Sequence, residues 1–428
     1  MRVLMFGWEF PPHISGGLGT ACYGITNGLL NNGIEVLFVV PHLFGDEEGE
    51  KFKFIDASEM GFNAFRKGNM EIFKLLKFIQ VSSSILPYLS PDSVLQSNSV
   101  EHNNNPFVYL DNTSFLPFNF SNHYGKDLMK EVVQYALIAS SIAEQNTFDV
   151  IHAHDWLTYP AGIVAKQISG KPLIVHVHAT EFDRSAGHIN KDVYDIELKG
   201  MQAADKIITV SEYTKRILLE HYQIDQEKIK VVHNGVNCQK DNSTIGDQSI
   251  NNNRIVTFLG RVTHQKGPDY YVEAAKKVLQ KFPDTHFVLA GSGDMLNKII
   301  KRVAELRMSS RFSFTGFLKG DEINRLFEMT DVYVMPSVSE PFGISPLEAA
   351  NKGVPVVISK QSGVSEVLKN ALKIDFWDID ALADSICGLL KYKTLSTKFS
   401  REAKKEVEKL NWDQVGLKIK QIYQSLII

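Results

Sequence analysis

Short apolar runs alternate with helix-like stretches along most of this chain, and this alternation limits its possible folds more than any other feature. Continuous apolar strands linked by helices predict parallel sheets whose two faces are both covered. The sequence therefore predicts an α/β protein with two doubly wound, Rossmann-like domains. The predicted strands are RVLMF, EVLFVV, DVIHA, LIVHV and KIITV in the first half and IVTFLG, HFVLAG, FSFTG, VYVMPS and VPVVIS in the second; the predicted helices between them include Leu18–Asn32, Asp127–Gln145, Tyr270–Lys281 and Met295–Arg307.

The boundaries of the two domains follow from shifts in composition. We expect a first domain at residues 1–236 and a second domain at residues 237–410. Residues 239–253 are polar and rich in Asn and Ser, which is typical of a linker or surface loop. The first domain is expected to carry an insertion at about 44–125, with a loop-like part at 82–123. The last segment, 411–428, is expected to form a helix that packs back on the first domain.

Charge and cysteine content favour a protein of the reducing cytoplasm. The 428 residues carry a formal net charge of -3, so the sequence does not call for a nucleic-acid partner. Cys22, Cys238 and Cys387 are scattered, which argues against disulfides and zinc clusters. We expect the first residues to form a strand rather than a secretory leader, and no apolar run approaches the roughly 20 residues that span a bilayer. The amphipathic segment Ile72–Ile79 is expected to pack as a helix, with peripheral membrane contact as the alternative.

Loops that follow the strands are the places to look for chemistry. Ligands of doubly wound sheets bind at the carboxyl ends of the strands, and two such edges that face each other form a deep cleft. After the first strand, Gly16 and Gly17 open a helix, where backbone N–H groups suit an anion such as a diphosphate. A dinucleotide fingerprint fails because Cys22 stands where its third glycine is needed, and Pro41 and His42 replace the expected acidic residue. A simple turn remains the alternative.

Two cations lie close together in the loop GRVTHQKG, after the first strand of the second domain. Arg261 and Lys266 could hold the diphosphate that leaves during sugar transfer. Surface charges on a loop are the alternative, because basic residues are common there.

Two glutamates mark the segment SEPFGISPLEA. Glu340 follows a strand, and a carboxylate in a loop at a ligand-binding edge indicates a functional role, such as gripping sugar hydroxyls. Glu348 has two interpretations that the spacing leaves about even. It could accept two ribose hydroxyls, or it could complete a capping box with Ser345 as N-cap and Pro346 as the first helical residue.

Several histidines and aspartates invite a metal interpretation. Strand alternation points His152 and His154 the same way, but no third ligand is evident nearby, so we expect no zinc. His154 is more attractive as a polar group at a sugar site, with His176 and His178 as a second polar edge. The Asp378-Ile379-Asp380 triplet precedes a helix and is expected to provide its N-cap rather than a metal site.

Taken together, these motifs resemble the retaining GT-B glycosyltransferases of family 4 and of the bacterial glycogen (starch) synthase type. The resemblance covers nearly the whole chain and rests on GGLGT, HAHDW, HNGV, GRVTHQKG, AGSGD and SEPFGISPLEA, of which the last, with its two glutamates, is the most specific. The opening WEFPPHISGGLG and the segment HATEFDRS resemble glycogen-synthase-like members in particular.

The resemblance implies a role for each matching residue. It places Glu340 and His154 beside the donor sugar, Arg261 and Lys266 on the diphosphate, and Glu348 on the ribose. The other residues it assigns to donor binding are Gly16, Gly17, Asn234, Phe317 and, through backbone N–H groups, Phe342, Gly343 and Ile344. Glu9 is assigned to the acceptor side. The resemblance implies no metal and no cofactor, since arginine and lysine neutralise the leaving group.

The expected activity is transfer of glucose from ADP-glucose or UDP-glucose to a growing α-1,4-glucan, with retention. Bacterial glycogen synthases usually have a lysine before the double glycine, whereas this chain has Ile14 and Ser15 there, which puts a preference for ADP-glucose in doubt. A family 4 hexosyltransferase that makes a surface polysaccharide or a lipid-linked glycan is the alternative. A GT-B epimerase or a silent sugar-nucleotide sensor represents another class, and the intact Arg261, Lys266 and Glu340 argue against silence.

Overall fold

The computed structural model describes residues 1–12, 16–45, 53–59, 128–185, 187–237 and 254–427. The predicted amphipathic helix at 72–79, the loop-like part of the insertion at 82–123 and the polar stretch at 239–253 lie outside the described residues. The chain forms two compact units. The first comprises residues 1–210, 214–233 and 413–428, and the second comprises residues 211–213 and 234–412.

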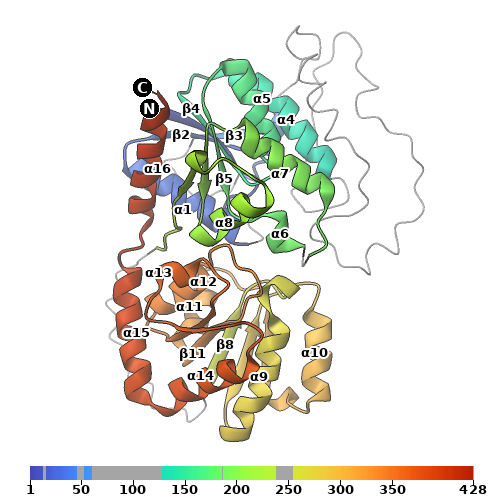
Figure 1. The fold of residues 1–428 in the computed structure, drawn as a ribbon, viewed down its shortest axis with the longest axis vertical. Coiled ribbons are helices and arrows are strands. Elements are labelled where there is room, and N and C mark those ends of the chain that lie inside the picture. The colour runs from blue at the N-terminus through green and yellow to red at the C-terminus, as the bar shows by residue number, and fades with distance from the viewer. Residues whose placement is uncertain (13–15, 46–52, 60–127, 186, 238–253, 428) are drawn as a thin grey trace, which may run out of the picture. The chain divides into compact units, whose positions relative to one another are not determined.

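The first unit is built on a seven-stranded parallel sheet with the order β3-β2-β1-β4-β5-β6-β7 (Figure 1). Its central strands are apolar on both sides, which is why helices cover both faces. Strand β1 pairs with β2 and β4, and the chain order reverses between β1 and β4. The strands are β1 (Arg2–Phe6), β2 (Glu35–Val40), β3 (Lys53–Asp56), β4 (Val150–His154), β5 (Leu173–Val177), β6 (Lys206–Thr209) and β7 (Ile229–Val231).

The helices of the first unit lie on opposite faces of this sheet. Helices α4, α5 and α7 pack against one another and against the Leu4, Phe6 and Ile151 side of the strands, where the main core lies. Helices α1 and α16 cover the other side, which carries Met5 and His152. The helices are α1 (Gly17–Asn31), α4 (Leu128–Gln145), α5 (Tyr159–Ser169), α6 (Glu181–Arg184), α7 (Lys191–Ala203), α8 (Glu212–His221), whose first two residues are counted in the second unit, and α16 (Trp412–Ile427).

The second unit repeats this architecture with a six-stranded parallel sheet in the order β10-β9-β8-β11-β12-β13 (Figure 1). Its chain order reverses between β8 and β11. The strands are β8 (Ile255–Leu259), β9 (His286–Ala290), β10 (Phe312–Gly316), β11 (Val332–Met335), β12 (Val356–Ser359) and β13 (Leu372–Ile374).

Local sequence signals explain where several helices of the second unit begin. Helix α9 starts with Pro268 behind Gly267, whose φ of 66° is a conformation that glycine adopts without strain. Asp378 caps α14 by accepting a hydrogen bond from the Ala381 N–H, so the expected N-cap is confirmed. The helices are α9 (Pro268–Lys281), α10 (Leu296–Glu305), α11 (Asp321–Glu328), α12 (Ser345–Asn351), α13 (Val364–Val367), α14 (Ile379–Lys391) and α15 (Lys393–Val407).

The predicted α/β class with two parallel, doubly wound sheets is confirmed, and the range proposed for the insertion contains a strand that the sequence did not predict. Strand β3 falls inside the range 44–125, yet it pairs with β2 through Leu37 and Lys53 and is the edge of the first sheet. Its four residues, KFID, are too few and too polar to show strand alternation. Among the described helices, none combines the length and the apolarity that crossing a bilayer demands.

Candidate functional site

The second unit brings the predicted cations and carboxylate together at the point where its strand order reverses. Arg261 and Lys266 lie in the loop after β8, and Glu340 lies in the loop after the neighbouring strand β11. Because both strands are parallel, both loops leave the same edge of the sheet, which is where doubly wound sheets bind their ligands.

Lys266 and Glu340 form a direct ion pair. The Lys266 Nζ donates to Glu340 Oε2, with the lysine side chain 20% exposed and the glutamate side chain 7% exposed. The Glu340 backbone is fixed on the other side, since its N–H donates to the Gln361 carbonyl at 3.0 Å and its carbonyl accepts from the Gly363 N–H at 2.9 Å. A partly exposed ammonium is thus held at a defined position by a buried carboxylate.

Close backbone packing fixes the loop that carries Lys266. A Cβ on Gly267 would lie 2.2 Å from the Pro336 carbonyl oxygen, so only glycine lets the two loops approach this closely. The Val338 N–H donates to the Gln265 carbonyl at 2.9 Å, which ties the loops together a second time. The Arg261 Nη2 donates to the Gln265 Oε1 at 3.3 Å, so the second cation contacts the same residue that ties the two loops together.

Glu348 does not take part in a capping box. The N-cap position of α12 is Ile344, and no side chain caps the described helix start. The Ser345 hydroxyl instead accepts a hydrogen bond from the Tyr333 hydroxyl at 2.7 Å. The capping interpretation is therefore wrong, because the Ser345 hydroxyl hydrogen-bonds the Tyr333 hydroxyl and caps no backbone N–H of α12. Desolvation raises the pKa of Glu348 to about 7.

The resemblance assigns further residues of the second unit to donor binding. All of them follow strands of its sheet except Asn234, which is the first residue of the range 234–412. Phe342 and Gly343 are buried just before α12, next to Ile344, and the Phe342 carbonyl accepts from the Val364 N–H at 2.7 Å. Phe317, after β10, is 45% exposed, with Lys319 Nζ 5.8 Å from its ring centroid. Asn234 is buried, and its Oδ1 has no hydrogen-bond partner among the described residues. Their roles stay predictions.

In the first unit, the strand order reverses between β1 and β4, and the predicted residues follow these two strands. Glu9 is 8% exposed after β1, and Gly16 is the N-cap of α1. A Cβ built on Gly16 or on Gly17 would meet no described atom within 4 Å, so packing within the chain does not demand glycine at either position. The first turn of α1 carries no acidic residue that would compete with an anion.

An array of four histidines, three of them buried and the fourth, His178, partly exposed, occupies the carboxyl ends of β4 and β5. His154 is the register partner of His176, and the alternation of each strand adds His152 and His178 to the same face. The rings stack, with centroids 4.3 Å apart for His152 and His154 and also for His176 and His178. The Nδ1 of His154 lies 2.9 Å from the Nε2 of His178, and these two nitrogens share a hydrogen bond.

Burial keeps these imidazoles neutral. Desolvation lowers the pKa of His152 and of His178 to about 3, and it also lowers the pKa of His154 and His176. His154 is fully buried, so its predicted contact with a sugar stays a prediction.

The expectation that no third metal ligand lies near His152 and His154 is wrong. His176 from the neighbouring strand completes one group of three, and Cys22 and His178 complete another around His154. Spacing within one strand could not reveal ligands that the β4–β5 register supplies. The ligand atoms of each group lie within 4.8 Å of one another, whereas tetrahedral ligation at zinc–nitrogen distances of about 2.0 Å needs nitrogens about 3.3 Å apart.

Comparison with known proteins adds the family. Residues 113–240 match the model of Glycosyltransferase Family 4, and residues 241–406 match the model of Glycosyl transferases group 1. A sucrose-phosphate synthase structure from Thermosynechococcus elongatus superposes with a TM-score of 0.71 at 17% identity, over 99% of this chain and 98% of that one. The chain is a glycosyltransferase family 4-like protein with the GT-B fold.

Curated relatives of this glycosyltransferase differ in what their names describe. An uncharacterized glycosyltransferase of Methanocaldococcus jannaschii is 28% identical over 99% of this chain and 98% of its own length. A UDP-Gal:alpha-D-GlcNAc-diphosphoundecaprenol alpha-1,3-galactosyltransferase of Escherichia coli is 26% identical over 84% and 97%. A glycogen synthase of Mycobacterium tuberculosis is 23% identical over 99% and 94%.

Sequence reasoning missed a buried charged network in the first unit of this glycosyltransferase. Arg184 pairs with Glu197 and Glu181, and the Tyr222 hydroxyl donates to Glu197. Desolvation raises the pKa of Glu197 to about 7. Glu181 and Arg184 belong to the motif HATEFDRS, but Glu197 comes from α7. The motif alone could therefore not identify the Arg184–Glu197 pair.

Asp155 is a second residue whose role the sequence did not reveal. Its φ of 58° is unusual for a residue other than glycine, and its Oδ1 accepts from the His178 N–H at 2.7 Å. Burial raises its pKa to about 6. Asp155 therefore ties the ends of β4 and β5 together beside the histidines.

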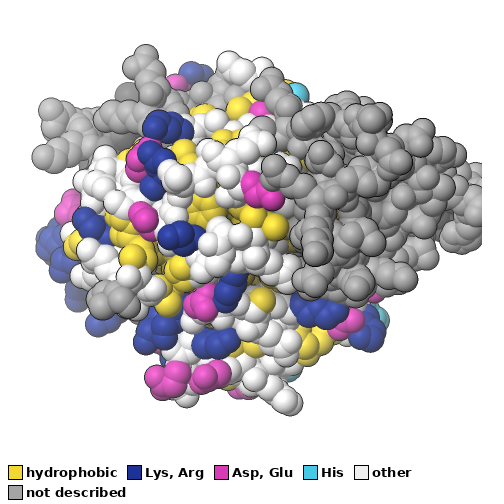
Figure 2. All heavy atoms as spheres, turned by 90° about the horizontal axis from the view of Figure 1, so that it is seen from above, with side chains coloured by type: hydrophobic (Ala, Val, Ile, Leu, Met, Phe, Trp, Pro, Cys, Tyr) yellow, Lys and Arg dark blue, Asp and Glu magenta, His cyan; other side chains and the backbone are white. Residues whose placement is uncertain are grey.

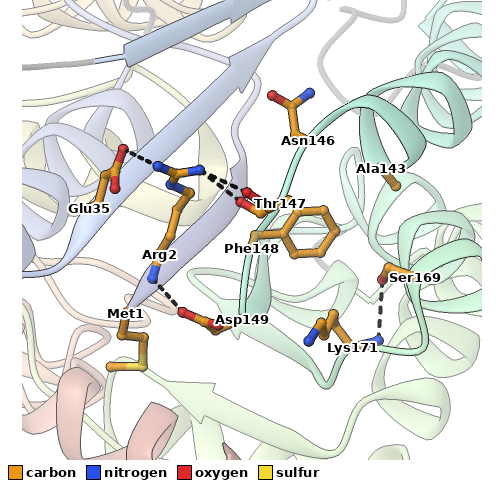
Figure 3. A pocket seen from close by; sticks show the side chains of 10 residues that line it. All are labelled: Met1, Arg2, Glu35, Ala143, Asn146, Thr147, Phe148, Asp149, Ser169 and Lys171. Carbon is orange, nitrogen blue, oxygen red and sulfur yellow. Dashed lines mark hydrogen bonds and ion pairs between the residues drawn. The ribbon is translucent and has the colours of Figure 1, made fainter.

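A pocket of about 610 Å³ lies at the opposite edge of the first sheet, where the strands begin (Figure 3). Arg2, Glu35 and Asp149 line it from the amino ends of β1, β2 and β4, and Arg2 pairs with Glu35 at 2.9 Å. This edge is not the one at which doubly wound sheets bind ligands. Figure 2 shows lysine, arginine, acidic and apolar side chains on the face that it displays.

Proposed function

We propose that this glycosyltransferase transfers glucose from ADP-glucose or UDP-glucose to a growing α-1,4-glucan, with retention of configuration. The observation that carries a sugar-nucleotide donor is the Lys266–Glu340 pair at the reversal point of the second sheet. The glycogen synthase of Mycobacterium tuberculosis, similar over nearly the whole chain, supports the glucan acceptor.

The proposed chemistry depends on negative charge that develops on the departing nucleoside diphosphate. Lys266 and Arg261 neutralise this charge, and a pre-positioned cation lowers the barrier because it does not have to reorganise during the reaction. Glu340 orients Lys266 and accepts hydrogen bonds from hydroxyls of the donor sugar. Glu348 receives the ribose hydroxyls. In this proposal the two basic residues perform the task that a metal ion performs elsewhere.

The second candidate is hexosyl transfer to a lipid-linked acceptor in the synthesis of a surface glycan. The Escherichia coli relative, whose name specifies a diphosphoundecaprenol acceptor, favours it and has a slightly higher identity than the glycogen synthase. Both candidates use the same donor residues of the second unit and differ in the acceptor.

A release assay tests both. Purified protein is incubated with ADP-glucose, UDP-glucose or UDP-galactose, each alone, with glycogen, or with a polyprenyl-diphosphate sugar, and free nucleoside diphosphate is measured. Release that depends on glycogen supports the glucan acceptor, and release that depends only on the lipid supports the alternative. Glu340→Ala should lose nearly all release, while Glu408→Ala, an exposed glutamate of the same unit, serves as the matched control. Normal turnover in Glu340→Ala would refute the proposed site.

A further inference from the structure

The histidine array of the first unit has one anchor that comes from the far end of the chain. The Tyr423 hydroxyl of α16 lies 2.6 Å from His152 Nδ1, and both side chains are fully buried. The tyrosine ring also stands edge-on to the imidazole, with centroids 5.7 Å apart and planes at 83°. A residue 271 positions away thus contacts the first ring of the array.

Helix α16 holds this tyrosine in place through its own contacts with α1. A Cβ on Gly416 would lie 2.2 Å from the Gly28 carbonyl carbon, so the two helices touch backbone to backbone. The Asn31 amide donates to Asp413 Oδ1 at 2.7 Å, and Lys420 Nζ donates to the Asn32 carbonyl at 2.7 Å. The Tyr423 hydroxyl therefore has little freedom to follow a rotation of the histidine.

The array transmits orientation because its rings are neutral and tightly stacked. A neutral imidazole has one donor and one acceptor nitrogen, so a hydrogen bond to either nitrogen restricts how the ring can turn. Tyr423 fixes His152, His152 stacks on His154, and His154 hydrogen-bonds His178. Nε2 of His152 and Nε2 of His154 have no hydrogen-bond partner among the described residues, so ring stacking and the hydrogen bond on Nδ1 orient each ring.

We propose that Tyr423 is a positioning residue for sugar transfer, which acts through His152 to hold His154 in one orientation. The inference rests on the proposed function and on the role beside the donor sugar that the family resemblance implies for His154. It assigns the last helix of the chain a task at the site of the first unit, in addition to covering the sheet.

Tyr423→Phe tests the inference, because it removes only the hydroxyl. Tyr135→Phe is the matched control: Tyr135 is also fully buried in the first unit, but its hydroxyl donates to the Gly7 and Val39 carbonyls. We expect kcat of Tyr423→Phe to fall about tenfold, less than the roughly hundredfold that a 1 Å misplacement of a reacting group can cost, because the phenyl ring stays packed against His152. Its KM for the donor should change less than about twofold, because Tyr423 and His152 are not among the residues that we propose to bind the nucleotide. In Tyr135→Phe, kcat should stay close to that of the wild type even where thermal stability drops.

A second measurement separates positioning from stability and does not need turnover. In protein labelled with ¹⁵N-histidine, Tyr423→Phe should shift the ring-nitrogen signals of both His152 and His154, while Tyr135→Phe should shift neither. In a His152→Asn background, the Tyr423→Phe change should have no further effect on kcat. Wild-type kcat in Tyr423→Phe, or signal changes confined to His152, would overturn the inference. Absence of transfer in the wild type would refute the proposed function instead, and the ring signals would then decide the inference alone.

Discussion

The two sheets of this glycosyltransferase have the same strand order around their reversal points but carry opposite chemistry there. The second unit places a charged pair, Lys266 and Glu340, in the loops after β8 and β11. The first unit places four neutral histidines at the ends of β4 and β5. The fold thus determines where a ligand can be bound, and a few residues at the strand ends determine what can be bound.

The largest expected effect concerns the charged pair. Lys266→Ala removes the cation that we propose for the departing diphosphate, and kcat should fall by about 10²–10³-fold, equivalent to about 3–4 kcal/mol. Steady-state assays of nucleoside diphosphate release measure this. The matched control is Lys277→Ala, which breaks an exposed ion pair with Asp380 in the same unit. Equal losses in the two variants would show that Lys266 has no special role.

The histidine array should make the first unit sensitive to acid. The folded pKa of His152 and of His178 is about 3, below the usual 6.5, so the unfolded chain binds more protons between these values. Stability is therefore present above pH 6.5 and is lost as the pH falls towards 3. At pH 5 the loss is about 2 kcal/mol for His152, and it is smaller for His178, whose side chain is partly exposed.

Calorimetry at pH 7.5 and pH 5.0 measures this loss. The His152→Gln/His178→Gln variant should be much less sensitive to the change than the wild type, while the exposed His188→Gln should behave like the wild type. An identical loss in all three proteins would contradict the assignment of acid sensitivity to the array.

The second unit should respond to pH in the opposite direction through Glu348. Its folded pKa of about 7 lies above the usual 4.5, so the folded state binds more protons between these values and stability falls as the pH rises through them. Glu348→Gln should gain about 1–2 kcal/mol at pH 8 and nothing at pH 4.5, after a discount for its partial exposure. Thermal unfolding at both pH values measures the gain. Glu408→Gln is the exposed control, and a gain of the same size there would remove Glu348 as its source.

Sequence reasoning predicted the parts of both regions that depend on strand ends. The loops of Lys266 and Glu340 could be brought together because parallel neighbours in a doubly wound sheet end at the same edge. The partners of His154 could not be found in this way, because His176 enters through the β4–β5 register. The capping interpretation of Glu348 failed for a similar reason, since the Tyr333 hydroxyl that hydrogen-bonds the Ser345 hydroxyl comes from β11.

The smallest expected effect concerns Phe317, which tests whether the nucleotide base binds at the edge of the second sheet. Nearly half of its surface is exposed after β10, and we expect a base to stack on its ring beside Lys319. Stacking of this kind contributes about 1–3 kcal/mol, and exposure puts Phe317→Ala at the low end, about fivefold weaker binding of UDP or ADP. Isothermal titration calorimetry of both nucleotides measures the loss. Phe317→Tyr should bind as the wild type does, because the aromatic face is kept. Trp377→Ala, another exposed aromatic residue of the same unit, is the control. Unchanged affinity in Phe317→Ala would place the base elsewhere and leave the Lys266–Glu340 pair as the nucleotide contact to be tested in this unit.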